Sequence, residues 1–136
     1  MQEVDYYKFK QDYTNNIVNC SDIQNVFSLW FFKIDNKEYS KNIINPMYTV
    51  FCLNTVLKYI IRAGKKKNND YHKDMYKAVD YLQFIYDIQE TNDFLCYLQK
   101  YLNFLSMMTN ETITKRAHKV IEMFCIKNNI KNKYTI

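Results

Sequence analysis

NPMYTVFCLNTVLKYIIRAG (residues 45–64), KKKNN (65–69) and DYHKDMYKAVDYLQFIYDIQE (70–90) form two helix-length segments on either side of one polar loop. Asn45 followed by Pro46 is a typical helix start, because asparagine caps the first turn and proline fits its first position. Gly64 is the expected end of this helix, since glycine readily adopts the left-handed conformation of a C-cap. Asp70 or the residues just after it open the next helix, which ends near Glu90. A short loop makes the two helices antiparallel neighbours.

Apolar residues at helical spacing give each of these helices one buried face. The expected core residues are Met47, Val50, Leu53, Leu57 and Ile60 in the first helix and Met75, Ala78, Val79, Leu82, Ile85 and Tyr86 in the second.

Three more helices are predicted outside this segment. Ser21 caps one that runs to about Lys33, Thr91 or Asn92 caps another, and residues 110–112 open the last. Their expected buried faces are Ile23, Val26, Phe27, Trp30 and Phe31; then Phe94, Leu98, Tyr101, Leu105 and Met108; then Ile113, Ala117, Val120, Ile121 and Phe124.

The remaining segments are less regular. Residues 4–9 suit a short strand or an extended arm. Asp35-Asn36 predicts a turn after the helix that runs to about Lys33, and the alternative is that residues 31–34 and 37–40 pair across it as a small hairpin. The tail from Asn128 is expected to fray. We therefore predict one all-α domain over residues 1–136, a compact bundle of four to five helices with or without a short N-terminal strand or hairpin. Its core is 46–90, and 91–128 form a C-terminal helical hairpin.

The composition excludes several classes of protein. The chain has 136 residues but only one glycine and one proline, so glycine-rich phosphate loops and dinucleotide fingerprints are excluded, and sandwiches or barrels are disfavoured. The four cysteines form no CxxC motif, the first ten residues lack the apolar core of a signal peptide, and no apolar run is long enough to span a membrane. We therefore expect reduced thiols, no membrane association and a cytoplasmic location.

The positive charge is concentrated in one stretch. Residues 58–77 hold seven basic and two acidic residues, which accounts for the whole net charge of +5, since the rest of the chain has twelve of each sign. Such a local field suggests an anionic partner, and a solvated basic loop is the alternative.

Helical spacing gathers part of this charge. Asn54, Lys58 and Arg62 lie four residues apart on the first helix, while Lys73 and Lys77 open the second, with Tyr81 one turn further. Lysine point charges, an arginine fork and helix N–H groups can together hold one or two phosphates. The predicted ligand-binding residues are Asn54, Lys58, Arg62, Lys65, Lys66, Lys73, Lys77 and Tyr81.

Asp74 gives Arg62 a second interpretation, because an ion pair between them would tie the two helices together. Asp74 reads as a helix N-terminal charge or a partner of Arg62 rather than a metal ligand. No catalytic residue, metal ligand or cofactor is predicted.

The run NTVLKYIIRAGKK (54–66), followed by DMYKAVDYL (74–82), resembles a small domain family common in phage genomes. Its signature is roughly N-x-x-K-Y-x-x-R-x-x-K, a short loop, then D-L-x-K-A-x-x-Y-L. Met75 replaces the family's leucine, and Leu53-Asn54-Thr55 replaces a commoner Leu-Gly-Asn. The family is mostly of unknown function and is related to the C-terminal part of a coliphage deoxynucleoside monophosphate kinase. The resemblance implies a phage protein that handles nucleotides.

Three functions follow from these observations. The first is a binding protein that sequesters a small anionic nucleotide, for instance a host immune signal, in the host cell cytoplasm. The second is a deoxynucleoside monophosphate kinase, and the third is a structural or protein-interaction module. Aromatic residues outside the helix stripes (Tyr6, Tyr7, Phe9, Tyr13 and Phe32) predict a homo-oligomer. Nucleic acid is not the predicted partner, because it needs a longer basic track.

Overall fold

The computed structural model describes residues 6–34, 44–65, 70–88 and 91–134. Its elements in chain order are β1 (Lys8–Lys10), β2 (Ile17–Asn19), α1 (Cys20–Ile34), α2 (Ile44–Arg62), α3 (Tyr71–Ile88), α4 (Thr91–Met108) and α5 (Glu111–Lys127). The predicted all-α fold is confirmed, with five helices and one two-stranded antiparallel sheet among the described residues.

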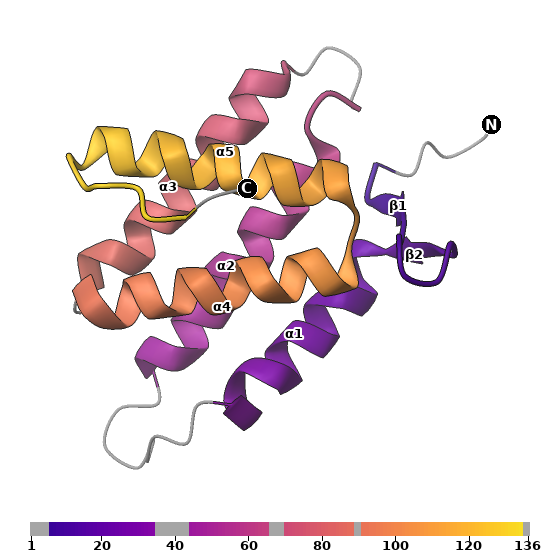
Figure 1. Ribbon diagram of the computed structural model, residues 1–136, viewed down its shortest axis with the longest axis horizontal. Coiled ribbons are helices and arrows are strands. Elements are labelled where there is room, and N and C mark those ends of the chain that lie inside the picture. The colour runs from indigo at the N-terminus through magenta and orange to yellow at the C-terminus, as the bar shows by residue number, and fades with distance from the viewer. Residues whose placement is uncertain (1–5, 35–43, 66–69, 89–90, 135–136) are drawn as a thin grey trace.

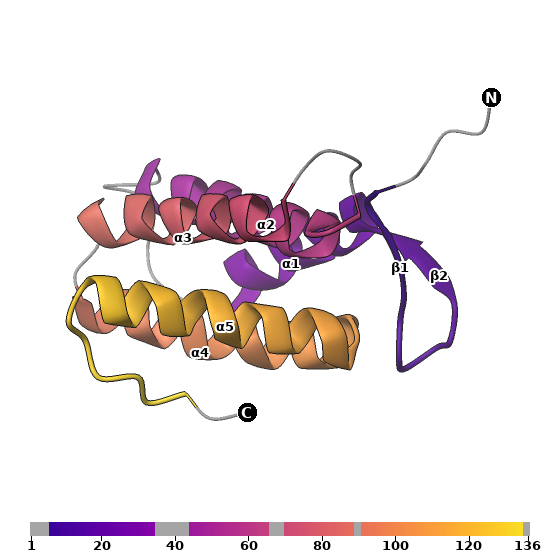
Figure 2. The ribbon, with the colours of Figure 1, turned by 90° about the horizontal axis from the view of Figure 1, so that it is seen from above.

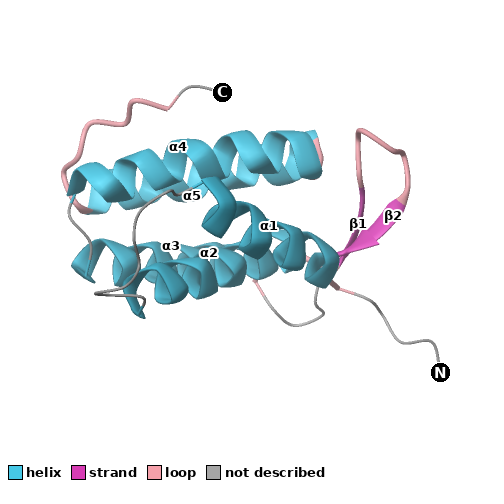
Figure 3. Ribbon diagram, turned by 90° about the horizontal axis from the view of Figure 1, so that it is seen from below, coloured by secondary structure: helices cyan, strands magenta, loops and turns pink. Residues whose placement is uncertain are grey.

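The helices form two layers that cross obliquely (Figure 1). One layer holds α2 and α3, and the other holds α4 and α5 (Figure 2). Helix α1 runs alongside α2 and between the layers (Figure 3). Across the described residues, every helix is too short or too polar to span a bilayer.

Gly64, Asp70 and Asn110 cap helices as the sequence predicts, whereas the predicted caps Ser21 and Asn45 lie inside helices, because α1 begins at Cys20 and α2 at Ile44. Gly64 has φ +80°, and the N–H of Lys65 donates to the Arg62 carbonyl at 2.9 Å, which ends α2 in a tight turn. The Asp70 carboxylate accepts from the N–H of His72 at 3.0 Å, and Asn110 accepts from the N–H of Ile113 at 2.9 Å. Helix α2 begins one residue before Asn45.

The core consists of the predicted faces with two corrections. Val26 is 41% exposed and Met47 is 55% exposed, so neither belongs to the core. Ile23, Phe27 and Phe31 form the narrow stripe of α1 that is buried, and Val26 lies beside that stripe. In α2 the stripe passes through Thr49 and Val50 and leaves Met47 on the solvent side.

Phe27 joins α1 to α4. Its ring lies 5.3 Å from that of Tyr101 and 5.1 Å from that of Phe104, and it also contacts Trp30 and Phe31 of its own helix. The Phe27–Tyr101 pair is edge-to-face, and aromatic pairs at these distances stabilise a core beyond the burial of their area.

The N-terminal strand begins at Lys8, four residues later than predicted, and belongs to a hairpin. β1 pairs with β2 in the register Lys8↔Asn19, Phe9↔Val18 and Lys10↔Ile17, where residues 4–9 were expected to supply a single strand or arm. The alternative hairpin at 31–40 is wrong, because residues 31–34 belong to α1; residues 37–40 lie outside the described part.

Two of the rings that predicted an oligomer are accommodated within one chain. Phe9 is buried, and the Tyr7 hydroxyl accepts a hydrogen bond from Arg62. Tyr13 is 87% exposed, Tyr6 is half-buried, and the side chain of Phe32 lies outside the described part. The homo-oligomer stays a prediction.

The tail does not fray over residues 128–134. The N–H of Ile130 donates to the Cys125 carbonyl at 2.9 Å, and the Tyr134 hydroxyl donates to the Leu95 carbonyl at 2.5 Å. These bonds hold the tail against α4, a contact that its polar sequence does not reveal.

Phe27→Ala should lower the free energy of unfolding by about 3–5 kcal/mol, because it removes a fully buried ring shared by two helices. Urea unfolding followed by circular dichroism measures this. Leu29→Ala on the same helix is the matched control, since Leu29 is 77% exposed and its truncation should change stability by less than about 0.5 kcal/mol. Equal effects of the two substitutions would contradict the packing of α1.

Candidate functional site

The junction of α2 and α3 holds a buried ion pair. Arg62 donates from Nη2 to Asp74 Oδ1 at 2.6 Å and from Nε to Oδ2 at 3.4 Å, so the guanidinium fork is matched by one carboxylate. Asp74 is fully buried and Arg62 is 8% exposed. The hydrogen bond to Asp74 raises the pKa of Arg62 above its ordinary value. The structure therefore shows Arg62 in the ion pair with Asp74 that ties the two helices together. Phosphate binding by Arg62 stays a prediction.

Arg62 also anchors the N-terminal hairpin. Its Nη1 donates to the Tyr7 hydroxyl at 3.2 Å, and the Lys65 ammonium donates to the Lys8 carbonyl at 2.8 Å. Two of the predicted ligand residues thus hold the hairpin against the end of α2.

Three positively charged side chains of this junction lie over the ring of Tyr59. The ammonium groups of Lys58 and Lys77 lie 5.1 and 5.5 Å from its ring centroid, and the Arg62 guanidinium lies 5.0 Å from it. Tyr81 packs against Tyr59 with ring centroids 6.0 Å apart. Among the described residues, no carboxylate lies within 4 Å of Lys58 or Lys77. The structure therefore brings these predicted residues together.

The other predicted residues lie elsewhere or outside the description. Asn54 faces α1, where its Nδ2 donates to Ser28 Oγ at 3.0 Å and to the Gln24 carbonyl at 3.4 Å. Its Oδ1 is buried without a hydrogen-bond partner in the structure. Lys73 is exposed at the start of α3, and Lys66 lies outside the described residues.

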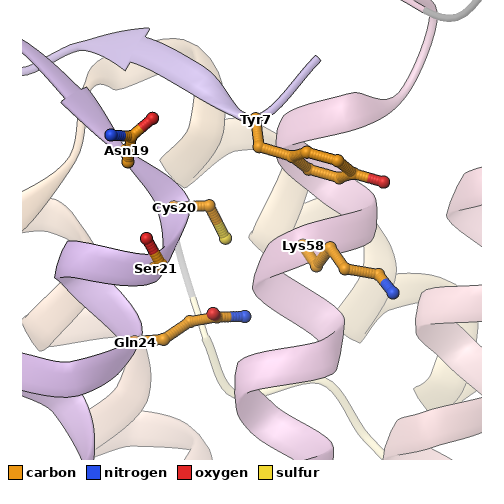
Figure 4. A pocket seen from close by; sticks show the side chains of 6 residues that line it. All are labelled: Tyr7, Asn19, Cys20, Ser21, Gln24 and Lys58. Atoms are coloured by element: carbon orange, nitrogen blue, oxygen red, sulfur yellow. The ribbon is translucent and has the colours of Figure 1, made fainter. Parts of the chain in front are cut away.

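A cavity of about 280 Å³ lies between the hairpin, the start of α1 and α2 (Figure 4). It is lined by Tyr7, Asn19, Cys20, Ser21, Gln24 and Lys58. In Figure 4 the stem of Lys58 lines the wall while its ammonium points away from Cys20 and Gln24. Sequence reasoning identified only Lys58, because docking of the hairpin depends on contacts such as Arg62–Tyr7, 55 residues apart, which have no local pattern.

The dipole of α1 and the charge of Lys58 both act on this cavity. The first turn of α1 contributes a positive dipole end, which Asp22 partly offsets by accepting from the N–H of Asn19 at 3.3 Å. Burial raises the pKa of Cys20 to about 12, although the charge of Lys58 lowers it in part. The Cys20 thiol is therefore protonated at neutral pH and is no nucleophile.

A second cavity of about 350 Å³ lies between α4, α5 and the tail, and it contains none of the predicted ligand residues. Its lining is Gln99, Leu102, Asn103, Ser106, Thr114, His118, Lys133 and Tyr134. Burial lowers the pKa of His118, which favours the neutral imidazole. Among the described residues, no cluster of three or more His, Cys, Asp or Glu side chains is placed to hold a metal ion.

Comparison with known proteins connects the chain to phages. Residues 32–83, which include all of α2 and most of α3, match a phage family described as a protein of unknown function (DUF3310). The chain is also 43% identical over 84 residues to the SaV proteins of Lactococcus phage p2 and Lactococcus phage SK1. The match covers 59% of this chain and spans 57% of the length of each relative. No solved structure matches.

These matches confirm the predicted resemblance to a phage domain family of unknown function. They also link the basic α2/α3 junction to the segment shared with the family, since Lys58, Arg62 and Lys77 all lie within it. Neither the family description nor the relatives' names mention a kinase, so the relation to a kinase stays a prediction.

Asp74→Asn should lower the free energy of unfolding by about 3 kcal/mol or more, because it leaves the Arg62 guanidinium buried opposite a neutral side chain. Arg62→Lys keeps the charge but loses the two-point contact, and we expect a loss of about 1–3 kcal/mol. Thermal and urea melts measure both. Lys115→Ala removes an exposed ion pair with Glu111 and should leave the melting temperature unchanged. Stability unaffected by Asp74→Asn would contradict the buried pair.

Iodoacetamide at pH 8 should alkylate Cys96 in the folded protein and spare Cys20, Cys52 and Cys125. Cys96 is exposed, whereas the other three thiols are buried, and burial raises the pKa of each. Mass spectrometry of the digested protein identifies the alkylated residues, and unfolding in guanidinium should make all four react. Rapid alkylation of Cys20 in the folded state would mean that the hairpin does not cover it.

Proposed function

We propose that this protein binds a small anionic nucleotide at the cavity beside the basic junction. One observation carries the proposal: Lys58 lines the cavity, and its ammonium lies beside Tyr59 together with that of Lys77. A phosphate near these two ammonium groups would find positive charge that no described carboxylate neutralises by direct contact. The base would enter the cavity next to Tyr7.

The dimensions of the cavity limit the ligand. A volume of about 280 Å³ is at the lower end of small-molecule sites. It suits one base with its sugar, and any phosphates would remain at the mouth with the lysines. Lysine contacts to phosphate act as mobile point charges, so we expect binding to weaken as the salt concentration rises.

The mode of action that we propose is sequestration in the cytoplasm of a phage-infected host cell. The similarity to phage proteins supports the setting, and a host immune signalling nucleotide is the proposed ligand class within it. Sequestration requires only a site that holds its ligand, whereas phosphoryl transfer needs two substrate sites and an arrangement that stabilises the transferring group.

Lys58→Ala should weaken nucleotide binding about tenfold to a hundredfold, the scale of one hydrogen bond to a charged group. Isothermal titration with a panel of mononucleotides, dinucleotides and cyclic nucleotides measures the affinity, and chromatography of each mixture shows whether the ligand stays intact. Lys115→Ala removes an equal charge from an exposed position on α5 that does not line the cavity, and it should bind as the wild type does.

Each outcome of this experiment decides between functions. Intact ligand that is retained by the wild type and lost from Lys58→Ala supports sequestration at this cavity. Turnover to a phosphorylated product would favour the kinase. Absence of binding across the whole panel would refute the proposal and leave a structural or interaction role.

A further inference from the structure

The α2/α3 layer carries a continuous set of aromatic rings, of which two are exposed and two are half-buried. We call Tyr48, Phe51, Tyr81 and Phe84 the aromatic strip. Its ring centroids lie 6.4 Å apart from Tyr48 to Phe51, 6.3 Å from Phe51 to Tyr81 and 5.2 Å from Tyr81 to Phe84. The strip therefore crosses from one helix to the other without a break, in the layer that Figure 2 shows opposite α4 and α5.

Much of this apolar surface is open to solvent. Phe51 is 57% exposed and Phe84 is 43% exposed, and Ile88, one turn beyond Phe84 on α3, is also 43% exposed. Single exposed apolar residues are ordinary, but rings that contact one another across two helices form a patch, and such patches mark interaction sites.

Positive charge lies beside Tyr81 of the strip. Tyr81 contacts Tyr59, where Lys58 and Lys77 gather, and Lys73 lies exposed one turn before Lys77. Lys73, Lys77 and Tyr81 are spaced by four residues, so one side of α3 runs from basic to aromatic. Among the described residues, neither Lys73 nor Lys77 has a carboxylate within 4 Å.

We infer that this face docks an acidic amphipathic segment of another protein. Apolar side chains of the segment would cover Phe51, Tyr81 and Phe84, and its carboxylates would meet Lys73 and Lys77. An amphipathic helix presents side chains at intervals of three and four residues, which matches the spacing of the strip along α3. The charges of such a segment complement those at the basic end of the face.

Two other occupants fit this face less well. A second copy of the chain would bring like charges toward one another, because each copy carries +5 and these lysines are part of its excess. Single-stranded nucleic acid binds along a groove in which cations follow the stacked bases. Here Lys73 and Lys77 precede Tyr81 on α3, and the charged residues of α3 beyond Lys77 are acidic, Asp80 and Asp87.

The inference goes beyond nucleotide binding and is tested separately from it. A random-sequence peptide library displayed on filamentous phage is selected against the full chain, and the enriched peptides are synthesised and titrated by fluorescence anisotropy. We expect enriched peptides with net negative charge and apolar residues at helical spacing. The double variant Phe51→Ser/Phe84→Ser should weaken their binding at least about tenfold, and so should Lys73→Glu/Lys77→Glu.

The matched control is Leu29→Ser/Ile126→Ser, which removes two apolar residues that are 77% and 73% exposed on other helices and should leave peptide binding unchanged. All these positions are exposed except Lys77, which is half-buried, and thermal melts establish that each variant folds. Nucleotide titration of Phe51→Ser/Phe84→Ser should match the wild type, because neither ring lines the cavity. Loss of peptide binding with intact nucleotide binding therefore isolates the docking face.

Several results would overturn the docking inference. Enriched peptides that are neutral or basic, or that bind the strip variant as tightly as the wild type, would refute it. Light scattering that shows a dimer dispersed by Phe51→Ser/Phe84→Ser would assign the face to a second copy. Tight binding of an oligothymidylate that this variant loses would assign it to nucleic acid.

Discussion

The ion pair between Arg62 and Asp74 is the contact on which the arrangement of this chain depends. It joins the last turn of α2 to the first turn of α3, and through the Tyr7 hydroxyl it also fixes the N-terminal hairpin. Both charges are buried, so neither tolerates the loss of the other. The cavity follows from this constraint, because Tyr7 forms one of its walls and Lys58 another. Arg62, which the sequence suggests as a ligand residue, therefore helps to build the cavity through its contact with Tyr7.

Both arginines of the chain serve the scaffold in this way. Arg116 of α5 donates to the Ile60 carbonyl at 2.8 Å, and its guanidinium lies 5.3 Å from the Tyr71 ring centroid. It thus packs α5 against the same end of α2 that Arg62 ties to α3. The two planar guanidinium groups join helices to one another, while the flexible lysines supply the positive charge that faces solvent. Any anion bound at this junction then meets mobile point charges, and its orientation must come from the shape of the cavity.

The helices could be predicted from the sequence because their signals are local. Gly64 ends α2 and Asn110 caps the start of α5, and both roles are predicted by the residue type and its close neighbours in the sequence. The buried residues of each helix recur every three or four positions. The hairpin could not be predicted in the same way, since each strand has three residues and its position depends on Arg62 far along the chain. The clustering of side chains at the candidate site was predicted in part. Four of the predicted residues do come together around Tyr59, namely Lys58, Arg62, Lys77 and Tyr81. Asn54 lies eight residues before Arg62, which is about 80° more than two full helical turns. Asn54 therefore faces α1 instead.

The cavity and the aromatic strip both include residues of α2 and share one electrostatic neighbourhood. The Lys58 and Lys77 ammonium groups lie 5.1 and 5.5 Å from the same Tyr59 ring centroid, so their separation is on the order of one Debye length at physiological salt. A phosphate at the cavity mouth would partly neutralise the field that attracts carboxylates to the strip, and bound carboxylates would weaken the field at the cavity. Because such coupling is reciprocal, each anion lowers the affinity for the other by the same factor. A nucleotide and an acidic protein segment that both bind here would compete through Tyr59 and its lysines without touching each other.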